Sequence, residues 1–598
     1  MSAWAPTIWP RAEGTQEDIT LSVGPEGLFA KIVMNATGIT FTVMGGVTSH
    51  SWQAAATALM SPTISETALA AISMTAPAGV TAAATLKARA ADYPAVDRRM
   101  RRGGPALREG RGRQGDRPAL AAARRRRLHR AAHPVQERPE ILASGATMLN
   151  AAKAGLLAAC FLAPLPAAAQ SAENLAVLKG LAPVAALAES KAGQAALAAN
   201  FVVTGDIQTG ALRQPTLLPF DTQRQQALRD AFITFGDLAE LADGLGSTLG
   251  AAYVARAHYR DRQHFTNISP DVAELVAYTI STAESDSSAG KFFFANATTD
   301  GKTPVSEEAA AIFKASGGAP DMFGRAYGRP AGGPGANIYG NSRPFLTEPH
   351  VFDIVGPDYF NTPADNGVYN RGPIMNLVNS PSFPSGHTTY GYAGGLVLAM
   401  LVPQRYQQMI ARAGEYGDDR ILMGAHYAMD VLGGRTLATY DVAHLLANDP
   451  AYLGRTFKYA APIADYQAAL GKARADVTAA LESGCGDKIA ACGKDDTSRF
   501  SDSARNEAFY AATQTYGLPV VFSQTADAAE DVAKLAPEAG YLLTSAFPSL
   551  TLEEADRILT ETEGPGGGFL DDGSAFGVYS RLNLYAAAGL AKQAAAYK

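Results

Sequence analysis

The chain has 598 residues, of which 47% are hydrophobic and 8% aromatic, a composition that can build ordinary globular cores. This length allows about four domains, although fewer are common. The formal net charge of −6 gives no reason to expect binding to nucleic acid.

The first 147 residues differ in character from the rest of the chain. Residues 98–138 contain a block of arginines, including Arg124 to Arg127, with no lysine and almost no apolar pattern. Such a block is typical of a basic arm for nucleic acid or membrane, or of a disordered segment. A third interpretation is that residues 1–147 are not native coding sequence, and the segment that follows favours it.

Residues 148–169 have the features of a secretory signal peptide. Lys153 gives a charged start, an apolar stretch follows, and small residues precede Gln170. Because such signals lie at the N-terminus, we expect translation to start at Met148, which would make residues 1–147 a disordered or mis-annotated extension. The alternative is an internal buried helix, since alanine-rich apolar runs also form core helices.

Beyond this segment the hydrophobic spacing predicts a mostly helical protein. Strand signals are scarce, so we expect an all-α fold, with a helical bundle as the catalytic domain over residues 170–450. The expected helices are 172–200, 222–260, 271–284, 306–315 and those within 388–447. Residues 316–375 are rich in glycine, proline and asparagine and predict a long loop region, of the kind that often forms active-site walls.

This loop region carries the first of three segments with catalytic chemistry. Arg343 is followed by Pro344, which restricts the preceding residue to extended geometry. The guanidinium of Arg343 would offer a planar fork to phosphate oxygens.

The second segment is Pro384-Ser385-Gly386-His387, followed by an apolar run to Val402 that predicts a buried helix. A helix that begins near Ser385 directs backbone N–H groups at an anion. His387 would lie at that anion site, placed to protonate a leaving group.

The third segment, from Asp419 to Gly434, predicts a helix that is ended by glycines. Residues four apart share one face of a helix, so Asp430 is expected to contact His426 and fix its tautomer. The other ring nitrogen of His426 would then be free to act as nucleophile. Arg420 is expected near the start of this helix or in the loop before it, where it would bind phosphate oxygens.

Together these segments resemble the type 2 phosphatidic-acid phosphatase superfamily, which includes soluble bacterial class A acid phosphatases, membrane lipid phosphatases and vanadium haloperoxidases. Its pattern is Lys-x6-Arg-Pro, then Pro-Ser-Gly-His, then Ser-Arg-x5-His-x3-Asp. The resemblance implies a helical fold, a phosphohistidine formed on His426, orientation of that ring by Asp430, and acid catalysis by His387. The phosphoryl-binding residues that it implies are Arg343, Ser385, Gly386 and Arg420.

The chain departs from this pattern at two positions. Asp419 replaces the serine before Arg420, and Ala336 stands where the family has its lysine, seven residues before Arg343. Since such sites work mainly by electrostatics, loss of one cation could lower the rate by about two to three powers of ten. The cations considered as substitutes are Lys302, Lys314, Arg325 and Arg329.

The two cysteines that follow the predicted signal peptide are consistent with an exported protein. After the signal segment only Cys485 and Cys492 remain, and in an oxidising compartment they predict a small disulfide loop. The alternative is two free thiols in a cytosolic protein. The pair offers too few ligands for zinc, so no metal site is expected. No segment beyond 148–169 is long enough to span a membrane, which favours a periplasmic or secreted protein.

Residues 451–598 extend beyond the resemblance to the catalytic core. Their spacing predicts further helices at 462–483, 505–516 and 551–562, and a flexible glycine-rich loop that begins at Gly564. This extension is expected to cap the core or to shape the substrate pocket.

The resemblance implies hydrolysis of small phosphate monoesters through a phosphohistidine, without a cofactor. One alternative is a vanadium-dependent haloperoxidase, in which His426 would bind vanadate. A second is a non-catalytic relative, because Ala336 replaces the lysine. If the enzyme is active, His426 must be neutral and His387 protonated, which predicts a bell-shaped pH profile on the acidic to neutral side.

Overall fold

The structure is a computed structural model that describes four strands within residues 22–52 and most of the chain from Ala172 to Tyr597. The gaps in the second range are 212–214, 295–296, 298–303, 319–323, 325–330, 334–335, 349–350 and 352. The arginine block 98–138 and the predicted signal peptide 148–169 lie outside the described residues. The chain divides into two compact units, Met1–Ala152 and Lys153–Lys598.

The first unit contains an antiparallel meander in the order β1-β2-β3-β4. Its strands are β1 (Ser22–Val23), β2 (Phe29–Asn35), β3 (Gly38–Met44) and β4 (Ser49–Trp52). In the longest pairing, between β2 and β3, Ile32 lies opposite Phe41. The expectation that this part of the chain is not native stays a prediction.

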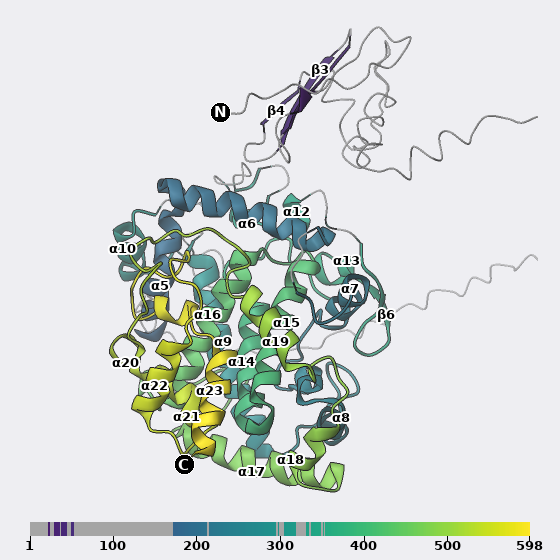
Figure 1. The fold of residues 1–598 in the computed structure, drawn as a ribbon, viewed down its shortest axis with the longest axis vertical. Coiled ribbons are helices and arrows are strands. Elements are labelled where there is room, and N and C mark those ends of the chain that lie inside the picture. The colour runs from purple at the N-terminus through teal and green to yellow at the C-terminus, as the bar shows by residue number, and fades with distance from the viewer. Residues whose placement is uncertain are drawn as a thin grey trace, which may run out of the picture. The chain divides into compact units, whose positions relative to one another are not determined.

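The second unit is helical, so the prediction of an all-α fold is confirmed (Figure 1). Its described residues include one short antiparallel ribbon, formed by β5 (Val355–Pro357) and β6 (Pro363–Asp365). The helices before the core are α5 (Ala172–Leu181), α6 (Lys191–Thr209), α7 (Phe220–Arg229), α8 (Ser247–Ala257), α9 (Pro270–Phe293), α10 (Glu307–Ala315), α12 (Pro344–Thr347) and α13 (Asn366–Asn370). The 3₁₀ helices are η1 (Ala182–Glu189), η2 (Ala239–Leu245), η3 (Pro403–Arg405), η4 (Gly493–Asp495), η5 (Pro537–Gly540) and η6 (Gly577–Ser580).

The core is built around α14 (Gly386–Leu401), which packs against α9, α15 (Tyr406–Leu422) and α16 (Ala428–Leu446) (Figure 1). Glycines on α14 allow α15 to approach closely. A Cβ atom on Gly391 would lie 2.2 Å from the ring of Tyr416, and one on Gly395 would lie 2.8 Å from the Cβ of Ala413. The same core positions the beginnings of α14 and α16, where His387 and Asp430, two of the predicted catalytic residues, lie.

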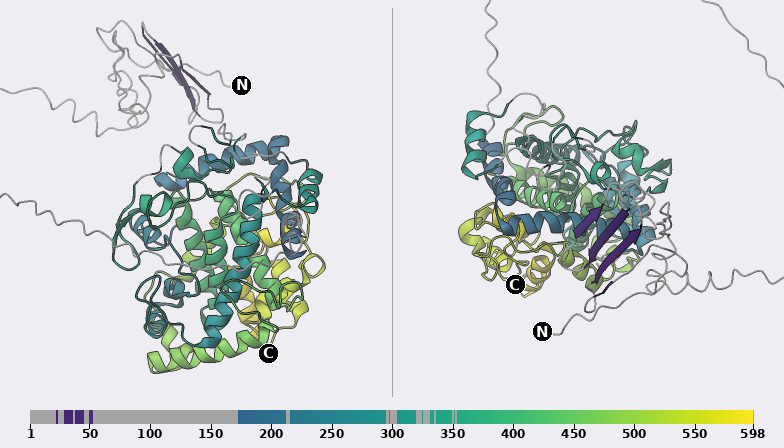
Figure 2. Two further views of the ribbon diagram at one scale, coloured as in Figure 1. Left: turned by 180° about the vertical axis from the view of Figure 1, so that it is seen from behind. Right: turned by 90° about the horizontal axis from the view of Figure 1, so that it is seen from above.

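The C-terminal region packs onto these helices rather than standing apart. The views of Figures 1 and 2 place its yellow helices along one side of the unit, where they contact α15 and α16. The side chain of Arg435 on α16 donates hydrogen bonds to the hydroxyl of Tyr510 and to the carbonyl of Leu582. The helices of this region are α17 (Tyr466–Cys485), α18 (Ile489–Cys492), α19 (Ser503–Ala512), α20 (Val532–Leu535), α21 (Tyr541–Thr544), α22 (Leu552–Glu561) and α23 (Leu584–Ala596).

The glycine-rich loop near Gly564 is anchored rather than flexible, so the prediction of a flexible loop was wrong. The amide of Gly567 donates to the carboxylate of Asp571 at 2.6 Å, and the side chain of Phe569 is buried against Phe383. The physical reason is that the loop contributes an aromatic side chain to the core, which its glycines alone do not reveal.

Cys485 and Cys492 form a disulfide in the structure. Cys485 is the last residue of α17, and Gly486 follows with a φ of 81°, which ends the helix in the left-handed conformation. The bridge therefore connects the end of α17 to the short helix α18.

Candidate active site

His426 lies in the loop between α15 and α16. Helix α15 ends at Leu422, and Gly424 takes a φ of 73°, which reverses the chain before α16 begins at Ala428. The single helix predicted over 419–434 was therefore wrong. Gly433 and Gly434 do not end a helix: both lie inside α16, where a Cβ atom on Gly434 would come within 2.5 Å of the carbonyl oxygen of Ser385.

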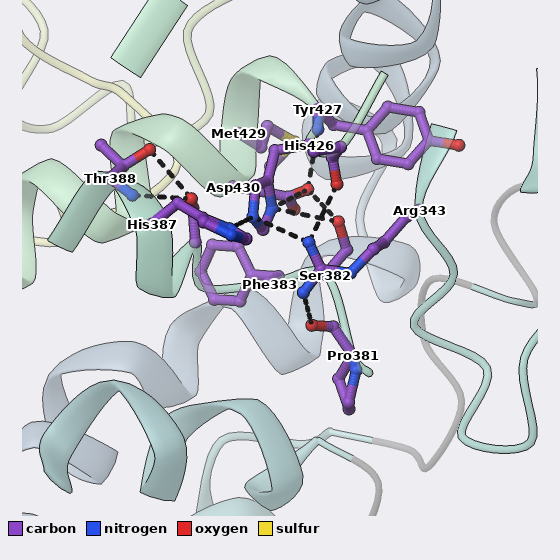
Figure 3. A network of polar contacts seen from close by, with 12 residues as sticks. Arg343, Pro381, Ser382, Phe383, His387, Thr388, His426, Tyr427, Met429 and Asp430 are labelled. Atoms are coloured by element: carbon purple, nitrogen blue, oxygen red, sulfur yellow. Dashed lines mark hydrogen bonds and ion pairs between the residues drawn. The ribbon is translucent and has the colours of Figure 1, made fainter. Parts of the chain in front are cut away.

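Asp430 nevertheless reaches His426, because Asp430 lies in the first turn of α16. Its Oδ2 accepts a hydrogen bond from the amide of Tyr427 at 2.8 Å and lies 3.5 Å from Nδ1 of His426. The same oxygen accepts a 2.5 Å hydrogen bond from the hydroxyl of Ser382, which is 3.4 Å from Nδ1 (Figure 3). Asp430 is thus held by two donors while it faces the imidazole ring.

His387 lies in the first turn of α14 and faces the other side of the His426 ring. Its Nδ1 lies 3.1 Å from Nε2 of His426 (Figure 3). The hydroxyl of Ser385 caps this helix by accepting from the amide of Thr388 at 3.1 Å. The amides of Gly386 and His387 are the first two of α14, and such amides have no acceptor within their own helix.

Arg343 is fully buried and reaches His426 from the loop before α12. Its NH1 group lies 2.9 Å from Nε2 of His426 and donates to the carbonyl of Ala425 at 3.1 Å. Its other nitrogens donate to the carbonyls of Ser380 and Pro381. Burial lowers the pKa of Arg343 to about 10, so the guanidinium stays charged at neutral pH.

Arg420 does not join this hydrogen-bonded group. It lies in the last turn of α15 rather than at a helix start, with its guanidinium 4.5 Å from the ring centroid of Tyr416. Its side chain donates to the carbonyls of Tyr416 and Ala227. Its charge still lowers the pKa values of His387 and His426, so it contributes to the positive potential of the site.

Burial sets the protonation states of the site. It lowers the pKa of both histidines well below the usual range, and the charge of Arg343 adds to this effect. Burial also raises the pKa of Asp430 to about 7, against the hydrogen bonds from Ser382 and Tyr427. A neutral His426 is the form that can act as nucleophile.

Two residues near this group were not predicted from the sequence. One is Ser382, whose only signal was its place two residues before Pro384. The other is Lys291 on α9: a Cβ atom on Gly386 would lie 2.6 Å from Nζ of Lys291. Of the four cations considered before, Lys314 is exposed in the last turn of α10, whereas Lys302, Arg325 and Arg329 lie outside the described residues.

A separate cavity of about 220 Å³ lies beside the segment that carries Arg343. It is lined by Phe345, Glu348, Val351, Asp353, Asn366, Gly367, Asn370 and Arg371. Neither His387 nor His426 lines this cavity, so it is distinct from the group of polar contacts around His426.

Among the described residues, no group of three or more His, Cys, Asp or Glu side chains is arranged to hold a metal ion. No helix in this part of the chain is both long and apolar enough to cross a membrane.

The fold and the site together define a class of protein. A helical core holds a buried histidine that is oriented by a carboxylate and faced by an arginine and a second histidine, which is a site for binding and transfer of an oxyanion. Residues 335–449 match the family model described as the PAP2 superfamily, so the family resemblance is confirmed for this part of the chain.

Three curated relatives are similar to short stretches of the chain. A non-specific acid phosphatase of Salmonella typhimurium is 35% identical over 107 residues, 18% of this chain and 36% of that protein. An acid phosphatase of Zymomonas mobilis is 41% identical over 64 residues, 11% of this chain and 24% of that protein. A lipid A 1-phosphatase of Rhizobium etli is 37% identical over 78 residues, 13% of this chain and 32% of that protein. The chain thus spans about a quarter to a third of the length of these relatives.

Proposed function

We propose that the protein hydrolyses phosphate monoesters through a phosphohistidine on His426. The observation that carries this proposal is the pair of contacts on either side of the His426 ring. Nδ1 faces Asp430 at 3.5 Å, and Nε2 faces Arg343 and His387 at 2.9 and 3.1 Å. This arrangement orients one nitrogen and surrounds the other with groups that bind or protonate phosphate oxygens.

The reaction takes place in two steps. In the first, Nε2 of His426 forms a bond to phosphorus while the ester P–O bond breaks, and His387 gives its proton to the leaving oxygen. In the second, His387 takes a proton from a water molecule whose oxygen attacks phosphorus, which breaks the P–N bond and releases phosphate. Arg343 and the first amides of α14 hold the phosphoryl oxygens in both steps.

The matched relatives support hydrolysis over the haloperoxidase alternative, because those described above are named as phosphatases. In the alternative, the same residues would hold vanadate, which has the shape of the phosphoryl transition state. We also propose a periplasmic or secreted location, which the Cys485–Cys492 disulfide supports.

The test is hydrolysis of p-nitrophenyl phosphate by the full chain in the presence of EDTA, beside the His426→Ala variant. Turnover that disappears in the variant is expected. Absence of turnover in the wild-type protein would overturn the proposal. Halide oxidation by the wild-type protein in the presence of vanadate and peroxide would instead support the alternative.

A further inference from the structure

We propose that Lys291 and Ser287 of α9 bind the phosphoryl oxygens and supply the cation that is absent at Ala336. The inference rests on the proposed function in one respect, namely that the site receives a phosphate-like oxyanion. Residue 291 precedes residue 336 by 45 positions and belongs to a different element from the loop of Arg343. One positive charge of the site, beside those of Arg343 and Arg420, would therefore come from a helix outside the three motifs.

The geometry places both side chains at the beginning of α14. A Cβ atom on Gly386 would lie 2.6 Å from Nζ of Lys291 and 3.2 Å from Oγ of Ser287. Residues 287 and 291 are four apart, so both project from the same face of α9, and α9 packs against α14. The space that Gly386 leaves by having no side chain is thus bordered by an ammonium, a hydroxyl and the first amides of a helix.

Within the described part of the chain, neither polar group is held by another side chain. Ser287 is fully buried, and its hydroxyl has no hydrogen-bond partner among the described residues. No hydrogen bond or ion pair to a described residue holds the ammonium of Lys291. A buried polar group without a partner is costly, and such groups are rare in folded proteins unless a ligand or water satisfies them. An oxyanion at this position would satisfy both.

The charges around Lys291 fit the same interpretation. Burial, and then the charge of Arg343, lower the pKa of Lys291 to about 7, whereas the carboxylates of Glu284 and Asp430 act in the opposite direction, so the ammonium is charged at acid pH. The charge of Lys291 in turn lowers the pKa values of His387 and His426. Lys291 therefore belongs to the same electrostatic group as His387 and His426, and an incoming phosphate would meet the charges of both Arg343 and Lys291.

Binding of orthovanadate to the full chain, measured by calorimetry, tests this assignment without requiring turnover. We expect Lys291→Met to weaken vanadate binding about a hundredfold, the effect typical of losing one oxyanion donor. Lys291→Arg keeps the charge and is expected to retain more of the affinity than Lys291→Met. Lys314→Met is the matched control, since Lys314 is an exposed lysine of the neighbouring sequence, and its binding should equal that of the wild type.

The Ser287→Ala variant provides a second, milder change. It removes a buried hydroxyl that has no partner, so it is expected to fold and to weaken vanadate binding by about tenfold. Thermal melting checks that each variant is folded. Wild-type affinity in both Lys291→Met and Ser287→Ala would overturn the inference.

The two proposals fail in different ways. If the wild-type protein hydrolyses p-nitrophenyl phosphate but Lys291→Met binds vanadate and turns over like the wild type, this inference is wrong and the hydrolase proposal stands. If the wild-type protein shows no hydrolysis while Lys291→Met still loses vanadate binding, the oxyanion site is supported and the hydrolase proposal is wrong.

Discussion

Arg343 fixes the tautomer of His426. The NH1 group of Arg343 lies 2.9 Å from Nε2 of His426, and a guanidinium can only donate a hydrogen bond. Nε2 must therefore carry the lone pair, which leaves the proton on Nδ1, the nitrogen that faces Asp430. In the proposed mechanism, the nucleophilic nitrogen is thus prepared before substrate arrives, and the phosphoryl group would displace the contact between Nε2 and Arg343.

The role of His387 as acid predicts a dependence on the leaving group. His387→Ala should retain much of its activity on 2,4-dinitrophenyl phosphate, whose leaving group needs no proton. On alkyl phosphates the same variant should lose about two to four powers of ten, because the alkoxide must be protonated as it leaves. Steady-state rates on both substrates check this. Equal losses on the two would contradict the assignment.

Ser382 is predicted to act by positioning Asp430. Ser382→Ala removes the 2.5 Å hydrogen bond to Oδ2 and should lower kcat by about tenfold, with little change in KM, because Ser382 orients the carboxylate rather than binding substrate. Ser382→Thr keeps a hydroxyl and should restore part of the rate. The exposed Ser501→Ala serves as control. A change confined to KM would argue against positioning.

The rate should be highest at acid pH. Burial and neighbouring cations lower the pKa of His387 below its ordinary value of about 6.5, so the free enzyme loses the catalytic proton as the pH rises through this lowered value. We therefore expect kcat/KM to decline across the neutral range. A profile measured from about pH 4 to about pH 9 checks this, since kcat/KM reports the free enzyme. A steady rise into alkaline pH would refute it.

The buried carboxyl group of Asp418 should make the stability of the folded protein depend on pH. Burial, and then the nearby Glu415, raise the pKa of Asp418 to about 7 in the folded protein. An acid whose pKa is higher in the folded than in the unfolded state stabilises the folded state while it is protonated. For Asp418 this stabilisation is lost as the pH rises through about 7. Asp418→Asn should therefore raise the melting temperature relative to wild type more at about pH 8 than at about pH 5. The exposed Asp527→Asn should show no such difference between the two pH values.

The C-terminal region should stabilise the second motif. Phe569 is buried, and its ring centroid lies 6.3 Å from that of Phe383, which precedes Pro384. Phe569→Ala should lower the free energy of unfolding by about 3–5 kcal/mol and reduce kcat as well. Urea unfolding and rates measured together check this, with the exposed Val520→Ala as control. Unchanged stability would show that the contact is not part of the core.

The chemical groups of the site could be predicted from the sequence because each motif is local. The tetrapeptide that ends at His387 begins a helix, and the interval between His426 and Asp430 brings them together whether or not one helix spans both. The helix boundary could not be predicted, because the reversal of the chain depends on Gly424 and on the packing of α14 against α16. The position of the Arg420 side chain could not be predicted either. We expected it to bind phosphate oxygens beside the histidines, but its guanidinium contacts the ring of Tyr416.

Residue types and short intervals are enough to predict the helical class, the order of Arg343, His387, His426 and Asp430, and the missing lysine at Ala336. Which cation stands near the site instead depends on how the helices pack. Nothing in the sequence around Lys291 distinguishes it from other lysines, and it approaches Gly386 only because α9 packs against α14. The physical reason is that helix periodicity is a local property, whereas the contact between two helices depends on the shape of both surfaces.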